Sequence, residues 1–572
     1  MNAHGKIGPS VVLSNSSALS GSLDDQPLPG FRHFLRTPDD DQRFAIDGVT
    51  FDPKQHLGRA NELMGKLAGL MVAATPGPRE NDTIPSGYTY FLQLLAHDLV
   101  NTSLSLSRYE GNRQGVENDR RMPLRLETIY GGGPAQCPFA FESGQAGLRD
   151  HLRLGKIRKD NLPFDGTGDL RDIARARPVA VVDSNPVTNR FPKYSEALIP
   201  DARNDHGILS QMVVLFHHLH NKILEALESN ASLATRAGSF ADVQKRFATA
   251  QSACILIYRS LIQNDLFPLL LHKEVLKHYR GSADAIMDRP TDLEAHVWIA
   301  PIEFAFGFFR FGHSMIRGAY SFNPLTPVQD SRTFNITSVL EHSSATSPQA
   351  MPVENKWTIE WSRFFGRNPQ TNSSMRIGPS GRMELENAVR DRDHDPRGLT
   401  VRDLTSSIVT QPWSLRALVQ EISKTHGDLI QLSPLLRDDR GAPHAPPWFN
   451  RVKEWLETQD RLKVLQPKDI STLANDPPLP FFARFEAEAE GDDGQHLGIL
   501  ASIMVADVFY GILACDKIQG IDNGPHLEDQ LRRLSDITFG AGKDAFAGMG
   551  DLNTFTKVIN YLGARVAFPT SG

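Results

Sequence analysis

Three segments of the chain place histidine, arginine or amide side chains on otherwise apolar helices, where such groups can do acid–base or cofactor chemistry. The first is IPSGYTYFLQLLAHDLV, residues 84–100. Its Gln93 and His97 are four residues apart, so they share one face of a predicted helix. Because a buried imidazole needs a polar partner, two interpretations stay open for His97: a hydrogen-bonded core histidine or a proton-transfer group.

The second segment is IPDARNDHGILSQMVVLFHHLHNKIL, residues 199–224. Arg203 lies in a polar turn just before a long apolar helix, where a surface ion pair is the ordinary role of an arginine. Further along the helix, the HHLH cluster (His217, His218, His220) suggests a metal site. No acidic residue lies between the histidines as an HExxH motif requires, so packing or hydrogen bonding is favoured over metal binding.

The third segment is PIEFAFGFFRFGHSMIRGAY, residues 301–320, a predicted helix crowded with Phe. Arg310 and His313 are three residues apart and therefore neighbours, while Gly307 and Gly312 leave the backbone open to a large flat ligand. An apolar wall with one histidine and flanking cations suits a heme, with imidazole to the iron and guanidinium to a propionate. The alternative is a plain Phe stripe in the core.

The elements that must position these groups are mostly helices. Helical periodicity predicts a helix from the turn at Pro85, Ser86 and Gly87 up to residue 100, a helix pair over 241–279, and helices over 208–224, 413–425, 449–463 and 497–516. Residues 320–380 are loop-rich, and no long alternating strand pattern occurs. The fold class is therefore mainly α, one large helical domain with long loops and little β-structure. We expect an extended N-terminal arm over 1–45, the helical domain over 46–535 and an irregular C-terminal tail over 536–572.

Composition narrows the classes of protein. The 572 residues are 40% hydrophobic and 22% charged with a net charge of −6, which fits a globular protein without the basic field of a nucleic-acid binder. The longest apolar run, 499–514, is too short for a membrane span. No signal peptide is visible and three widely spaced cysteines predict no disulfide framework, so we expect a cytoplasmic or non-classically secreted protein.

Taken together, the motifs resemble the animal-type heme peroxidase superfamily (peroxidase/cyclooxygenase-like), and specifically its bacterial branch. The similar segments follow one another in order over about residues 80–520: GYTYFLQLLAHD (87–98), LRLETIYGGGP (124–134), PDARNDHG (200–207), FRFGHSM (309–315), ENAVRDR (386–392), PPWF (446–449) and the apolar run from 496. The resemblance implies a large helical fold around a heme b, and an enzyme that reduces hydrogen peroxide and oxidises small organic donors or halides in the response to oxidative stress.

The resemblance also implies roles by position. His97 matches the distal histidine that takes a proton from hydrogen peroxide, and Gln93 matches the distal glutamine that orders water or an anion. Arg203 matches the distal arginine that stabilises cleavage of the O–O bond. His313 matches the axial ligand of the heme iron, and Arg310 matches the arginine that pairs with a heme propionate.

Two departures from the family pattern lead to further predictions. Ala96 and His206 occupy the positions of the two acids that esterify the heme in many members, so the heme is predicted to be non-covalent. The family also binds calcium through the acid after the distal histidine, here Asp98. Because Arg125 falls where a second acidic ligand is expected, calcium is not predicted, and we expect Arg125 to pair with Asp98 in its place.

Some features stay open at this level. The family's proximal histidine hydrogen-bonds an amide side chain, which has no clear counterpart in this sequence. A heme-dependent fatty-acid dioxygenase is an alternative function, although that chemistry needs a tyrosine near the proximal histidine, where this chain has five Phe between 304 and 311 and Tyr320 only afterwards. A non-catalytic heme-binding or adhesion protein is another alternative. Retention of both acid–base and charge-stabilising groups argues against it.

Overall fold

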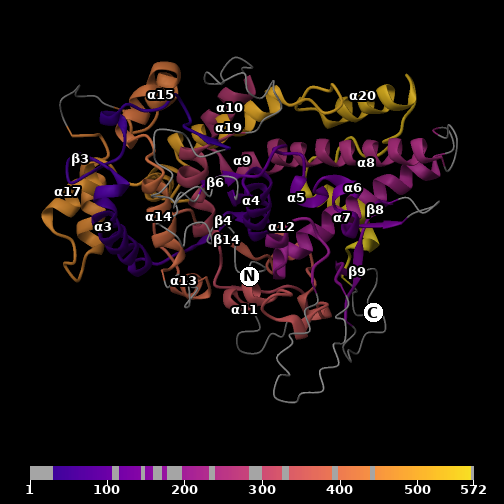
Figure 1. Ribbon diagram of the computed structural model, residues 1–572, viewed down its shortest axis with the longest axis horizontal. Helices are drawn as coiled ribbons and strands as arrows, with labels where there is room; N and C mark the ends of the chain where they lie inside the picture. The colour runs from indigo at the N-terminus through magenta and orange to yellow at the C-terminus, as the bar shows by residue number, and fades with distance from the viewer. Residues whose placement is uncertain are drawn as a thin grey trace.

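The chain folds mainly into helices, as predicted (Figure 1). The computed structural model describes residues 30–105, 115–143, 149–158, 170–176, 196–230, 233, 239–281, 299–324, 334–366, 368–389, 397–437 and 445–568. The longer helices are α3 (Pro53–Ala73), α4 (Ser86–Leu99), α7 (Gly207–Ser229), α8 (Phe240–Leu261), α10 (Lys273–Gly281), α14 (Leu399–Val409), α15 (Leu415–Ile430), α16 (Phe449–Gln459), α17 (Pro467–Asn475), α18 (Leu479–Glu490), α19 (Ile499–Cys515), α20 (Leu527–Phe539) and α21 (Phe555–Leu562).

Shorter helices connect these elements: α5 (Glu127–Tyr130), α6 (Gly133–Gln136), α9 (Phe267–Leu270), α11 (Ile336–Glu341), α12 (Ser362–Phe365) and α13 (Met383–Ala388). The described strands form only two-stranded ribbons: β1 (Phe31–Arg32) with β11 (Ala300–Pro301), β2 (Ala45–Ile46) with β3 (Val49–Thr50), β4 (Glu80–Pro85) with β14 (Ser373–Met375), β5 (Thr102–Ser105) with β6 (Gly115–Asn118), β7 (Phe141–Ser143) with β8 (Arg149–Leu152), β9 (Leu154–Lys156) with β10 (Arg171–Ile173), and β12 (Ala319–Tyr320) with β13 (Phe334–Asn335).

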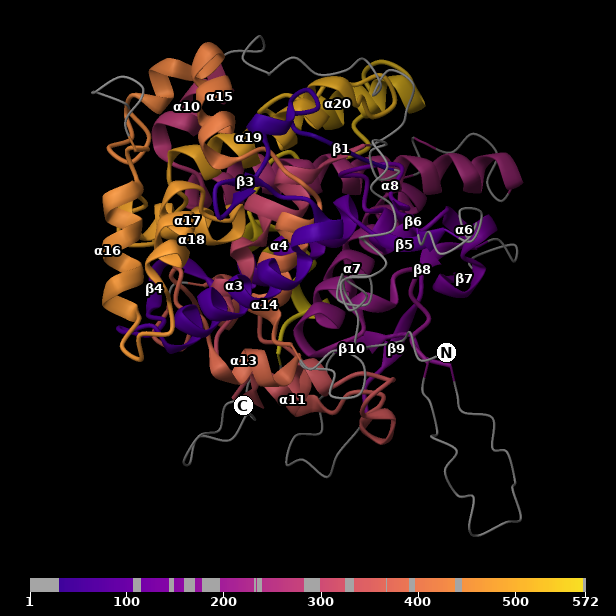
Figure 2. The ribbon, with the colours of Figure 1, turned by 60° about the vertical axis from the view of Figure 1, so that its left-hand side comes forward.

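Helix α4 lies near the middle of the molecule and organises it (Figure 1). It packs against α7 and also against the segment that carries His313. Figure 2 shows α16 and α17 at one end of the molecule and α8 at the other. The interior between them is one continuous apolar core, so α4 is buried along nearly its whole length.

The segment predicted as a regular helix over 301–320 is irregular, and on this point the prediction is wrong. A π-helical turn, η9 (Glu303–Gly307), continues into a 3-10 helix, η10 (Phe308–Met315). Gly307 joins them with φ −113° and ψ −100°, and a Cβ there would lie 3.0 Å from the side chain of Leu479. Because a 3-10 helix has ~3 residues per turn, side chains three apart stack along one row.

Both predicted terminal segments have described parts that contact the domain. In the predicted arm, β1 pairs with β11 and Phe31 is buried, while residues 1–29 lie outside the described residues. In the predicted tail, Phe555 of α21 stacks on Phe365 at 4.0 Å and meets Phe91 of α4 at 4.7 Å. The domain boundaries themselves stay predictions.

None of the helices in the described ranges is long and apolar enough to cross a lipid bilayer.

Candidate active site

Helix α4 has one face that is not closely packed. Of its residues, only Gln93 and Ala96 are partly exposed, and they lie three apart on the same side. The open face thus lies beside His97, which is itself 5% exposed.

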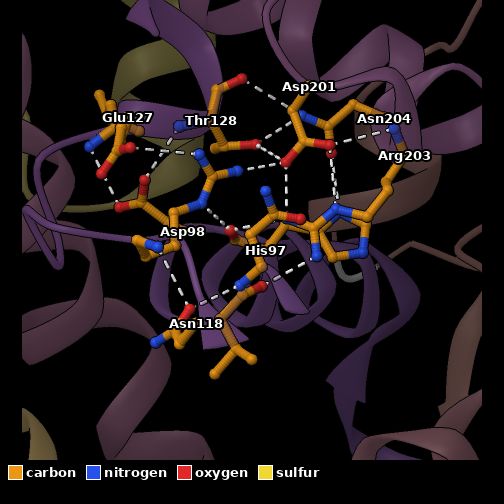
Figure 3. A network of polar contacts seen from close by, with 12 residues as sticks. His97, Asp98, Asn118, Glu127, Thr128, Asp201, Arg203 and Asn204 are labelled. Carbon is orange, nitrogen blue, oxygen red and sulfur yellow. Dashed lines mark hydrogen bonds and ion pairs between the residues drawn. The ribbon is translucent and has the colours of Figure 1, made fainter. Parts of the chain in front are cut away.

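His97 is held by an amide from the turn before α7. Its Nδ1–H donates to Oδ1 of Asn204 over 2.8 Å. The amide nitrogen of Asn204 donates in turn to Oγ1 of Thr128 over 2.7 Å, which fixes which end of the amide faces the imidazole (Figure 3). With the proton on Nδ1, the Nε2 of His97 is the basic nitrogen, and it makes no hydrogen bond within the described part of the chain.

Burial keeps the His97 imidazole neutral. Loss of solvent, and next the positive charge of Arg203, lower the pKa of His97 to about 3. A neutral imidazole with a fixed tautomer can accept a proton at Nε2 and return it to another atom.

Arg203 reaches the main chain of His97 rather than its ring. Its Nη2 donates to the His97 carbonyl over 3.0 Å, its Nη1 to the Val100 carbonyl over 2.8 Å, and its Nε to Asp201 over 2.9 Å. Arg203 and His97 are therefore brought together as the sequence predicted, with the guanidinium bound to carbonyl groups and a carboxylate. In this position it holds the C-terminal turn of α4.

Gln93 lies against a second imidazole. Its Nε2 is 3.3 Å from Nε2 of His206, the residue that precedes α7. Burial lowers the pKa of His206 to about 4, so this ring is neutral as well. Gln93, His97 and His206 thus form a polar group without formal charge around the open face of α4.

His313 lies on η10 and is tethered through the same nitrogen as His97. Its Nδ1–H donates to Oδ2 of Asp403, a residue of α14, over 2.7 Å. The His313 side chain is 32% exposed although it comes from an interior element, and its Nε2 has no hydrogen bond to any described residue. A Cβ placed on the adjacent Gly312 would meet nothing within 4 Å, so open space borders this ring.

Arg310 lies three residues before His313 on the same 3-10 helix, and both side chains contact Asp403. Its Nε donates to the Ala305 carbonyl over 2.9 Å, and its Nη1 lies 3.8 Å from Oδ1 of Asp403. The Arg310 side chain is 9% exposed, and its guanidinium lies beside the carboxylate that holds the histidine. The structure therefore brings Arg310 and His313 together around Asp403; the pairing of Arg310 with a propionate stays a prediction.

The predicted pair between Arg125 and Asp98 is wrong. Arg125 binds Asp516, with Nε–Oδ2 at 2.9 Å and Nη2–Oδ1 at 2.6 Å. Asp98 instead accepts the main-chain N–H groups of Leu126 (3.1 Å) and Thr128 (3.2 Å), a local geometry that the sequence does not reveal. Burial raises the pKa of Asp98 to about 6.

Arg120 is a second arginine that contacts the main chain of α4. Its Nε donates to the His97 carbonyl over 2.7 Å, its Nη1 is 3.6 Å from Glu127, and its Nη2 binds Asp201. Two guanidiniums, those of Arg120 and Arg203, therefore share Asp201 and the carbonyl of His97.

The HHLH histidines make structural contacts. His217 donates through Nδ1 to the Arg153 carbonyl over 2.9 Å, and His220 donates through Nε2 to the Asp150 carbonyl over 3.0 Å. The Nδ1 of His220 accepts from the hydroxyl of Tyr130 at 3.0 Å. Hydrogen bonding, which the sequence favoured over metal binding, is confirmed for these two. Across the described ranges no group of three or more His, Cys, Asp or Glu side chains is arranged to hold a metal ion.

Sequence reasoning missed Asn204 and Asp403, the partners of the two histidines. Asn204 is adjacent to Arg203, so a search for an amide near each functional histidine could have found it. Asp403 carries no local signal, because it lies in an ordinary amphipathic helix 90 residues after His313. Arg484 also binds Asp403, at 2.9 Å, and no local sequence pattern marks it either.

The residues present fit a heme. A free imidazole Nε2 beside open space at Gly312 can ligate iron, and the Phe residues of η9 and η10 supply an apolar wall. The partly exposed face of α4, a helix that packs against η10, presents a neutral imidazole and an amide.

Comparison with known proteins agrees with this fold. The structure is similar to that of peroxidase A from Dictyostelium discoideum, with a TM-score of 0.56 and 11% identity over 97% of this chain and 98% of that one. It is also similar to the fatty acid alpha-dioxygenase of Oryza sativa (TM-score 0.54, 11% identity, 99% and 92% covered) and to that of Arabidopsis thaliana (0.51, 11%, 89% and 78%). No protein-family model and no curated protein sequence matches the chain.

Proposed function

We propose that this chain is a heme-dependent oxidoreductase of the animal heme peroxidase superfamily that reduces hydrogen peroxide and oxidises a small organic donor or a halide. One observation carries the proposal. Two histidines, His97 and His313, lie on elements that pack on one another, and each is tethered through Nδ1 with its Nε2 left without a partner among the described residues.

In this proposal His313 holds the heme iron through Nε2. A heme supplies the capacity to accept and pass on electrons, and the protein supplies binding and proton transfer. Asp403 fixes the His313 ring, and the apolar wall of Phe side chains excludes water from one side.

His97 moves the proton. Its neutral Nε2 accepts a proton from hydrogen peroxide, and the same nitrogen returns it to the departing oxygen. Asn204 keeps the other ring proton on Nδ1 throughout, so the ring does not change tautomer. Gln93 orders a water molecule or small anion at the open face, while Arg203 and Arg120 hold the His97 main chain and place positive charge close to the site.

Heme retention without a covalent bond belongs to the same proposal. Ala96 has no carboxyl group, and His206 is a neutral imidazole beside Gln93, so neither offers an acid for an ester. Acid–acetone extraction of the heme-loaded protein is expected to separate the heme from the polypeptide; heme that remains on the chain would contradict this part. Because Arg120 supplies a cation among Asp201 and Glu127, we expect no calcium requirement, which elemental analysis checks.

A fatty-acid dioxygenase is the second candidate, because the fold is equally similar to alpha-dioxygenases and because two buried tyrosines lie near the site. Tyr90 of α4 and Tyr320, which follows η10, meet with ring centroids 5.6 Å apart. Within η10 itself no tyrosine occurs, which favours the peroxidase.

A spectroscopic and kinetic experiment separates these functions. The protein loaded with heme is mixed with hydrogen peroxide and guaiacol or bromide, and separately with oxygen and linoleate or palmitate. A Soret band that shifts with peroxide, together with donor turnover, supports the peroxidase, and oxygen uptake with the fatty acid supports the dioxygenase. A Soret band without either turnover supports a heme-binding role and contradicts both enzymes.

A further inference from the structure

The carboxylate behind His313 is shared by more than one partner. Oδ2 of Asp403 accepts Nδ1–H of His313 over 2.7 Å and also Nη2–H of Arg484 over 2.9 Å. Asp403 is 1% exposed and Arg484 is 3% exposed, so water does not compete for either contact. The same oxygen therefore divides its acceptor capacity between an imidazole and a guanidinium.

Three separate elements build this cluster. Asp403 comes from α14, Arg484 from α18, and His313 from η10. Arg484 also donates to the carbonyl of Arg310 over 3.0 Å, which ties α18 to the turn of η10 just before the histidine. The position of the ring is thus coupled to two helices that carry no other part of the site.

A plain charge-neutralising role does not explain this geometry. A carboxylate between two guanidiniums gains most when each of its oxygens accepts a hydrogen bond. Here Oδ1 has no hydrogen bond within the described residues, and Nη1 of Arg310 lies 3.8 Å from it. A buried acceptor without a partner costs free energy, so the arrangement favours the contact of Oδ2 with His313 over full pairing of the arginines.

The acceptor matters for the chemistry of the ring. The resemblance to heme peroxidases implies an amide as the partner of the proximal histidine, and this chain has a carboxylate instead. A charged acceptor draws the Nδ1 proton more strongly than an amide and makes Nε2 a stronger electron donor to a metal. Stronger donation stabilises ferric over ferrous iron and lowers the reduction potential.

We propose that Asp403 is the positioning residue that sets the orientation and the donor strength of His313, and that Arg484 limits this strength by sharing the same oxygen. This inference rests on the proposed function, since it requires a heme on His313. It adds a specific chemical consequence: an iron whose potential is set by competition between two donors for one carboxylate oxygen.

The test uses Asp403→Asn and Arg484→Gln in the full-length, heme-loaded protein, with two measurements. The first is the reduction potential of the heme, and the second is the iron–histidine stretching frequency of the ferrous form by resonance Raman spectroscopy. Asp403→Asn is expected to raise the potential by at least the equivalent of a tenfold change in the ferric/ferrous ratio, about 59 mV for one electron, and to lower the frequency. Arg484→Gln is expected to lower the potential and raise the frequency.

The matched control is Asp476→Asn. Asp476 is also a buried aspartate, but its oxygens accept the main-chain N–H groups of Leu415 and Ala45, and its substitution is expected to change neither quantity. If both test variants leave the frequency at the wild-type value, Asp403 only neutralises the arginines and the inference is overturned. Should Asp403→Asn fail to fold, the frequency shift of Arg484→Gln decides alone. If the wild-type protein binds heme but shows no iron–histidine band, both this inference and the proposed function are overturned.

Discussion

The two histidines of the site both donate a hydrogen bond through Nδ1, but one donates to a neutral amide and the other to a charged carboxylate. His97 is 5% exposed, lies on a regular α-helix and donates Nδ1–H to the neutral amide of Asn204. The His313 side chain is 32% exposed, lies on a 3-10 helix and donates Nδ1–H to the carboxylate of Asp403. A neutral acceptor leaves the ring free to gain and lose a proton, whereas a charged one makes it a better ligand. The hydrogen-bond partner thus suits one histidine to proton transfer and the other to metal binding.

The backbone conformation also differs between the two histidines, since His97 lies on a regular α-helix and His313 on a 3-10 helix. Helix α4 is regular and packed on nearly all sides, so only a narrow face near Gln93 and Ala96 stays open. In η10 the 3-10 geometry stacks Arg310 and His313 in one row above Asp403, with open space at Gly312. A proton-transfer group needs a fixed orientation in surroundings that exclude water. A metal ligand needs unoccupied space next to its donor atom.

The largest expected effect is the loss of heme when the ligand side is broken. His313→Ala removes the proposed iron ligand, so heme is expected to dissociate at least tenfold more readily than from the wild type, whereas His97→Ala is expected to retain it. Titration of the apoprotein with hemin, followed at the Soret band, measures this. Equal retention by the two variants would erase the distinction between the two sides.

The next effect is on turnover when the proton-transfer side is broken. His97→Leu keeps the apolar packing but has no base, so the rate of peroxide reduction is expected to fall by roughly 10²–10⁴. The measurement is stopped-flow kinetics with hydrogen peroxide on protein that shows a normal Soret band. Wild-type rates in this variant would assign the proton to another group.

A smaller effect follows when the distal acceptor is made to resemble the proximal one. Asn204→Asp places a carboxylate beside the Nδ1–H group of His97. The negative charge of this carboxylate favours the protonated ring, so the pKa of His97 is expected to rise. The acidic limb of the kcat/KM profile then moves to higher pH, and Asn204→Leu is expected to cost about tenfold in kcat/KM through loss of orientation. A profile that is unchanged in both variants would mean that Asn204 does not orient the ring.

The smallest effect at neutral pH concerns stability and grows on acidification. Burial lowers the pKa values of five histidines to between about 3 and 4: His97 of α4, His206 just before α7, and His217, His218 and His220 in the middle of α7. The unfolded chain binds protons at these rings near pH ~6.5, so their contribution is complete above that pH and is lost as the pH falls toward 4.

Urea unfolding at pH 7.5 and pH 5 measures this loss. Buried carboxyl groups with raised pKa values, such as Asp98 (about 6) and Glu486 (about 8), act in the opposite direction and offset part of it. His217→Phe is expected to reduce the difference in unfolding free energy between the two pH values. If His217→Phe leaves this difference at the wild-type value, the His217 ring is not buried and neutral.

Much of the site was predictable from local patterns. The helix that begins at Ser86 and the helix after Arg203 follow from apolar periodicity, whereas the roles of His97 and His313 came from the resemblance to heme peroxidases and stay predictions. The irregular backbone of 303–315 was not predictable, because its apolar residues fit a regular helix equally well and only packing against α18 and α14 selects the π and 3-10 turns. The prediction that Asp98 pairs with Arg125 was wrong for a similar reason. Asp98 accepts hydrogen bonds from main-chain N–H groups, which every residue except proline carries, so the sequence does not reveal them.

By itself, the sequence determined the helical class, because helical spacing is a local property, and it singled out Gln93, His97, Arg203 and His313, whose roles stay predictions. Only the tertiary structure decided which atoms these groups meet. Asn204 lies 107 residues from His97, and Asp403 lies 90 residues from His313. Contacts over such separations depend on how helices pack around a common core, and it is these contacts that give one histidine a neutral partner and the other a charged one.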